Sequence, residues 1–143
     1  MGTGWLPPTV GDLVWCWFPE APDTAPGPKP RPALVVGVEI RDDGAVVKVV
    51  YGTSQRVDRL KVGEFSIVRS RNPVAFALSG LAYDSKFDFK VIVDLPWSEE
   101  FFKVSPRPAY GQSPKLGTLH PSLLRAVQAA YESAKSRRRN ARN

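Results

Sequence analysis

Two hydrophobic runs joined by a short turn constrain the fold of this chain more than any other feature. Residues 33–40 (ALVVGVEI) and 45–51 (AVVKVVY) are rich in β-branched side chains, which is typical of strands. Between them stands RDDG, whose Asp-Gly pair supplies the positive φ that a tight turn requires. The pattern predicts a β-hairpin, in which the start of the first strand lies beside the end of the second.

The remaining hydrophobic runs predict a mainly β domain. LVWCWF at 13–18 is a strand run, and the six prolines of residues 19–32 then prevent both helix and strand ladder. Further short strands are predicted at 65–68, 74–78, 87–95 and 101–104. Because no βαβ alternation and no repeat is present, the order of elements favours a small, strongly curved barrel.

One helix is predicted near the C-terminus. Pro121 suits a first helical turn, and apolar residues follow at three- and four-residue spacing. They are Leu123, Leu124, Val127, Ala130, Tyr131 and Ala134. We expect this stripe to cover the sheet within a single domain at 1–136, followed by a basic, disordered and solvated tail at 137–143.

Length and charge exclude several classes of protein. The 143 residues make about one domain. Lys and Arg number 20 against 14 Asp and Glu, but residues 135–143 contain five of the basic residues and no acidic one, so the body is close to neutral. No apolar run reaches the 18 residues of a membrane span, and no signal-peptide pattern opens the chain. A soluble, cytoplasmic protein without membrane contact is expected.

The residue types needed for common catalytic centres are scarce. A single cysteine, Cys16, and a single histidine, His120, cannot supply a structural zinc site or a disulfide, and no phosphate-binding glycine motif occurs. We interpret Cys16 as a small buried hydrophobe. His120 stands directly before Pro121 and is expected at a helix terminus, not as a catalytic base. No metal or cofactor is predicted.

A different group of residues offers phosphate chemistry. Arg31 ends the proline-rich segment, and Thr53, Ser54 and Gln55 follow the second strand of the hairpin. Antiparallel pairing places Arg31 close to Thr53. A guanidinium beside hydroxyl groups can clamp a phosphate or its trigonal-bipyramidal transition state. The alternative interpretation is a surface arginine near a polar turn.

In three stretches the sequence resembles the MazF/PemK toxins of bacterial toxin–antitoxin systems. They are GDLVW at 11–15, PRPALVV at 30–36 and TSQ at 53–55, with a weaker similarity in GTL at 117–119. The resemblance spans most of the chain. It implies an SH3-like or plasmid-maintenance-toxin barrel, usually a homodimer. It also implies a growth-inhibiting, metal-independent endoribonuclease, a cognate antitoxin partner, and DNA binding by the toxin–antitoxin complex.

The resemblance also implies roles for individual residues. The catalytic arginine falls on Arg31 and the catalytic hydroxyl on Thr53, which together would cut single-stranded RNA to 2′,3′-cyclic phosphate and 5′-OH ends. By the resemblance Ser54 and Gln55 complete the polar cluster, and Asp84 and Lys86 are expected to contact RNA. Apart from the resemblance, contacts to RNA are also predicted for Lys29 and Trp17. The chain departs from the family in its proline-rich approach to Arg31, in Ser85 where relatives often carry glutamine, and in a longer segment at 87–114.

Three interpretations remain open from the sequence. Trp15 and Trp17 share one face of their strand and could stack on bases, although core or dimer packing is the commoner use of such a face. PGPKPRP at 26–32 has the composition of a polyproline ligand for an SH3-type partner. Finally, the whole domain could be a catalytically silent barrel that binds RNA or protein.

Overall fold

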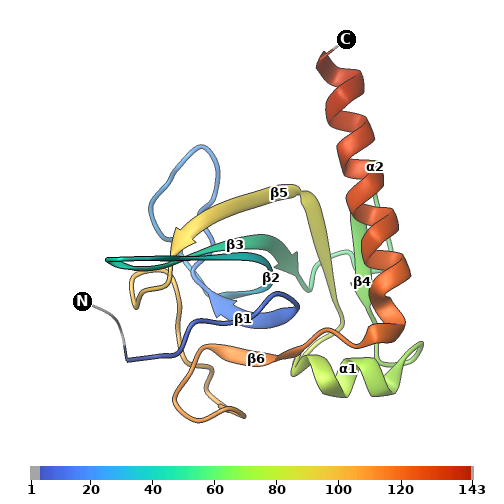
Figure 1. Ribbon diagram of the computed structural model, residues 1–143. Coiled ribbons are helices and arrows are strands. Elements are labelled where there is room, and N and C mark those ends of the chain that lie inside the picture. The colour runs from blue at the N-terminus through green and yellow to red at the C-terminus, as the bar shows by residue number, and fades with distance from the viewer. Residues whose placement is uncertain (1–3, 143) are drawn as a thin grey trace.

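The computed structural model describes residues 4–142, and their side chains as far as Arg138. Its centre is an antiparallel six-stranded sheet with the order β4-β5-β3-β2-β1-β6 (Figure 1). The strands are β1 Asp12–Cys16, β2 Arg31–Arg41, β3 Gly44–Thr53, β4 Glu64–Ile67, β5 Ser85–Pro96 and β6 Lys115–Thr118. The helices are α1 Pro73–Ser79, a 3-10 turn Pro121–Leu123 and α2 Leu124–Arg142. The expected mainly β fold with a C-terminal helix is confirmed, as a partly open, curved sheet.

The predicted hairpin forms the centre of this sheet. β2 and β3 pair from Ala33↔Tyr51 to Arg41↔Gly44, and Gly44 adopts φ 129°, which a residue with a side chain rarely does. β3 also pairs along its length with β5. Each strand of the hairpin is hydrogen-bonded to a neighbouring strand on both sides. This pairing holds the residues at the hairpin's open end in fixed positions.

Alternate side chains along the strands contribute to two separate hydrophobic clusters. Leu13 belongs to a cluster that α1 and α2 cover, whereas Val14 belongs to a second cluster closed by the segment after β5. That segment contributes three buried aromatic side chains, Trp97, Phe101 and Phe102. The long stretch after residue 87 therefore completes β5 and then closes one end of the core.

Two strand predictions are wrong. Residues 74–78 lie in α1, because the Asn72 side chain accepts a hydrogen bond from the amide of Ala75 at 3.1 Å, Pro73 fits the first turn, and Gly80 ends the helix at φ 71°. Residues 101–104 form a turn with only an isolated bridge between Phe102 and Cys16. β6, which follows Pro114 directly, was not predicted from the sequence.

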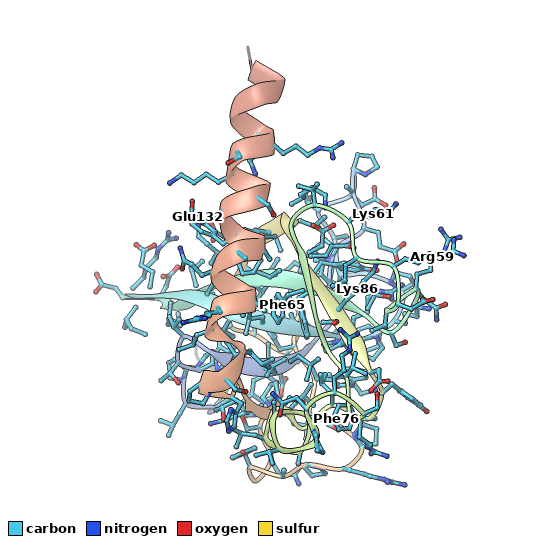
Figure 2. The ribbon with its side chains drawn as sticks, turned by 90° about the vertical axis from the view of Figure 1, so that its right-hand side faces the viewer. Arg59, Lys61, Phe65, Phe76, Lys86 and Glu132 are labelled. Carbon is cyan, nitrogen blue, oxygen red and sulfur yellow. The ribbon has the colours of Figure 1, made fainter. Side chains whose placement is uncertain are left out.

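The C-terminal helix begins as expected and extends further. The Nδ1 atom of His120 accepts a hydrogen bond from the amide of Ser122 at 3.0 Å, so this histidine caps the 3-10 turn. α2 then packs against β4 and β5 (Figure 2), although Leu124, expected in the buried stripe, is exposed.

The expected disordered tail is helical in this structure. α2 continues to Arg142, and its last turns project beyond the sheet (Figure 1). Arginine and lysine are good helix formers, and the Arg138 guanidinium donates to the carbonyl oxygen of Phe89. Asn143 and the side chains after Arg138 lie outside the described residues.

Candidate active site

The register of the hairpin brings Arg31 and Thr53 to neighbouring positions. The recorded pairing of β2 with β3 ends at Ala33↔Tyr51, and extending this register by two residues sets Arg31 opposite Thr53. Side chains alternate along a strand, and both residues therefore share the face of Ala33 and Tyr51. The strand ends are also in close contact, because a Cβ atom added to Gly52 would lie 2.4 Å from the carbonyl oxygen of Pro32.

An aromatic platform supports the Arg31 side chain. Its guanidinium lies 5.4 Å from the centroid of the Tyr51 ring, and that ring packs edge-on against buried Phe18. The Arg31 side chain is only 17% exposed, and its Nη2 atom lies 3.8 Å from the Oε1 atom of exposed Glu20. This distance exceeds a hydrogen bond, so Glu20 is a loose counter-ion of the guanidinium.

The Thr53 hydroxyl is oriented by its own turn. Its Oγ1 atom accepts a hydrogen bond from the backbone amide of Gln55 at 3.1 Å. A hydroxyl that accepts one hydrogen bond still has its proton to donate. Thr53 is half-buried, while Ser54 and Gln55 are exposed beside it. The turn thus fixes the Thr53 hydroxyl at the end of β3.

Lys86 pairs with Thr53 across β3 and β5, but its side chain is not available to RNA. Its Nζ atom donates to Oε1 of Glu64 and to the carbonyl oxygen of Arg59, each at 3.0 Å. The side chains of Lys86 and Glu64 are 8% and 7% exposed. Figure 2 shows Lys86 beside the loop that carries Arg59 and Lys61. The assignment of Lys86 as an RNA contact is therefore corrected to a buried ion pair.

The Glu64 carboxylate links this ion pair to the loop. Burial of Glu64 acts to raise its pKa, but hydrogen bonds from the Lys61 amide, at 2.7 Å, and from Lys86 outweigh burial, so the pKa lies below its usual value. The carboxylate stays ionised at neutral pH and holds the Lys61 amide, while its partner Lys86 holds the carbonyl oxygen of Arg59. The loop from residue 54 to 63 is consequently anchored at its far end.

The other residues expected to contact RNA lie on two flanks of this site. Asp84 accepts a hydrogen bond from the Arg69 amide at 2.9 Å and lines a surface hollow together with Ser54. Trp17 is half-buried under Lys103 and follows Cys16, which pairs with Arg31. Lys29 is exposed in the proline-rich loop.

Sequence reasoning missed Tyr51 and Glu20, the two immediate neighbours of the Arg31 guanidinium. The two-residue period of a strand could have indicated Tyr51, because Tyr51 stands two residues before Thr53 and therefore shares the same face of the strand. Nothing in the sequence singled out Glu20 within the proline-rich loop. Cys16 is fully buried as expected, and burial raises the pKa of its thiol far above the usual value, so it is no nucleophile here.

Among the described residues, no three His, Cys, Asp or Glu side chains lie close enough together to hold a metal ion. In residues 4–142, no helix has the length and apolar character needed to cross a membrane.

The fold is similar to that of a solved structure described as an endoribonuclease in complex with its cognate antitoxin, from Mycobacterial species. The TM-score is 0.56 at 19% sequence identity, and the match covers 91% of this chain and 96% of that chain. No protein-family model and no curated protein sequence matches the chain. At this identity the likeness establishes a shared fold across nearly the whole of both chains.

Proposed function

We propose that this protein is an endoribonuclease toxin that cuts single-stranded RNA without a metal ion. The observation that carries the proposal is the β2–β3 register, whose last recorded pair is Ala33↔Tyr51 and whose extension by two residues brings Arg31 and Thr53 together at the open end of the hairpin. Support comes from the shared fold with an endoribonuclease and from the sequence stretches that resemble MazF/PemK toxins.

The proposed reaction is a transesterification within the RNA. The ribose 2′-oxygen forms a bond to phosphorus and loses its proton, while the bond from phosphorus to the 5′-oxygen breaks and that oxygen gains a proton. The products are a 2′,3′-cyclic phosphate and a 5′-OH. Arg31 neutralises the charge on the phosphorane oxygens, and Thr53 donates a hydrogen bond to a non-bridging oxygen. Arginine loses its proton with great difficulty, so we assign Arg31 to charge neutralisation.

We expect the purified protein to cleave unstructured RNA in the presence of excess EDTA. An arginine clamp needs no divalent ion to stabilise the transition state, whereas a metal mechanism stops when the ion is chelated. The upstream product should carry a 2′,3′-cyclic phosphate, which mass spectrometry identifies, and the downstream product a 5′-OH, which resists a 5′-phosphate-dependent ligation. The same oligonucleotide with 2′-deoxyribose at the cleaved position serves as the control. Cleavage that EDTA abolishes, or that proceeds on the deoxy control, contradicts the proposal.

Thr53→Val should slow cleavage roughly tenfold or more and leave folding unchanged. Valine keeps the shape of threonine and removes the hydroxyl, so the loss is that of a charge-assisted hydrogen bond in the transition state. Thr53→Ser keeps the hydroxyl and should retain most of the activity. Single-turnover rates measured with saturating enzyme test both variants. Equal rates for Thr53→Val and the wild type would remove Thr53 from the mechanism.

The partners follow from the same proposal. A cognate antitoxin would cover the cationic site with an acidic or extended segment, and the similar solved structure is itself a complex with a cognate antitoxin. A homodimer and DNA binding by the toxin–antitoxin complex stay predictions from the family resemblance.

A catalytically silent barrel is the second candidate. It is favoured by the contacts of Arg31 with Tyr51 and Glu20, since a purely structural arginine makes the same contacts. Substitution of Arg31 separates the two candidates.

A further inference from the structure

A surface hollow continues from the proposed site beyond Thr53. It has a volume of about 600 Å³, and the loop after β3, the segment after β4 and the segment just before β5 form its walls. Ser54, which directly follows Thr53, lines it. Under the proposed function, an RNA strand bound at Thr53 would continue past Ser54 toward this hollow.

The walls of the hollow present an aromatic ring and two cations. Tyr83 lines it and is 73% exposed, which is unusual for so large a hydrophobic side chain. Arg56 and Arg71 line it from two other segments and are both exposed. Arg56 adopts φ 51°, a left-handed conformation that residues other than glycine seldom take. An exposed aromatic ring near arginines is the arrangement that proteins use to stack an unpaired base and hold its phosphate.

The same hollow presents two carboxylates, from Asp58 and Asp84. One oxygen of Asp84 already accepts the Arg69 amide, which fixes the carboxylate and leaves its second oxygen as an acceptor. Carboxylates repel phosphate but accept hydrogen bonds from the amino group of a base such as cytosine. The balanced charge of two arginines and two aspartates therefore fits a whole nucleotide better than a bare phosphate.

We infer that this hollow is a base-selective nucleotide subsite, in which Tyr83 stacks on one unpaired base, Arg56 and Arg71 hold its phosphates, and Asp84 selects a base that carries an amino group. The inference rests on the proposed function, because that function supplies the RNA strand that would occupy the hollow. The inference adds to that function the residues that determine which RNA base the protein prefers.

The test measures binding apart from cleavage. Short 2′-O-methyl oligonucleotides lack the attacking hydroxyl, so fluorescence anisotropy reports affinity even for an active enzyme. Tyr83→Ala should weaken binding roughly tenfold, as the loss of one stacked base does, while Tyr83→Phe keeps the ring and the affinity. Arg71→Gln should weaken binding and flatten its salt dependence.

Matched controls lie in the connection between β5 and β6. Tyr110 is also an exposed tyrosine but lines a different hollow, and Arg107 is exposed. Tyr110→Ala and Arg107→Gln should bind as the wild type does. Thermal unfolding of each variant checks that the fold is intact.

Base selection is tested with oligocytidine against oligouridine. The wild type should favour cytidine, and Asp84→Asn, which keeps an acceptor for Arg69, should reduce that preference severalfold. Unchanged affinity in Tyr83→Ala, or unchanged base preference in Asp84→Asn, overturns the subsite. A wild type that binds through the hollow without cutting natural RNA refutes the proposed cleavage and leaves the subsite standing. A wild type that binds no oligonucleotide refutes both.

Discussion

Replacing Arg31 by alanine is expected to lower the rate of RNA cleavage by a hundredfold or more. A preorganised donor to a transition-state oxyanion contributes about 3 kcal/mol, and Arg31 is held in place by the Tyr51 ring and the end of β2. The cost in stability is smaller, because the variant loses a contact with one ring, worth about 1 kcal/mol, and leaves Glu20 with access to water. Single-turnover kinetics and urea unfolding measure the two effects separately.

Conservative and distant substitutions make this experiment specific. Arg31→Lys should also fail, since an ammonium group cannot reproduce the two parallel donors of a guanidinium. Arg41, at the other end of β2, pairs with Glu39 at 3.0 Å on an exposed surface, and Arg41→Ala should cleave normally. Normal cleavage by Arg31→Ala would instead favour the catalytically silent barrel.

The open end of the hairpin was predictable because its determinants are local. An Asp-Gly turn and two β-branched runs set the register, which the structure records from Arg41↔Gly44 to Ala33↔Tyr51. The capping role of His120 followed from its position before Pro121. In each case the residues that decide the geometry are close in the sequence.

The errors arose where the deciding contacts are distant or where one pattern fits two structures. Residues 74–78 are apolar enough for a strand, and the helix depends on the cap at Asn72 and the left-handed Gly80. Lys86 looked like a free cation, because its partner Glu64 is 22 residues away in another strand. The hollow with Tyr83 joins three segments that only the folded chain brings together.

The buried ion pair gives the second large expected effect. Lys86→Met should destabilise the fold by about 3 kcal/mol at pH 7, because it leaves the Glu64 carboxylate buried without its cation. Methionine keeps most of the side-chain volume, so the loss is chiefly electrostatic. Lys48→Met is the matched control: Lys48 pairs with Asp94 at 3.7 Å on the exposed part of β3, and its loss should cost no more than about 0.5 kcal/mol. Urea unfolding of both variants gives the comparison.

The pH dependence distinguishes a lost charge pair from lost packing. In the wild type the pKa of Glu64 is lowered from 4.5, so its stabilising effect is complete above that pH and disappears as the pH falls through the folded-state pKa. In Lys86→Met, burial without the cation raises the pKa of Glu64, and protonation relieves the unpaired charge. The difference from the wild type should therefore shrink between pH 7 and pH 4. Adding Glu64→Gln, which keeps an acceptor for the Lys61 amide, should recover most of the loss at pH 7. A loss that is equal at both pH values and persists in the double variant would mean that Lys86 acts through packing.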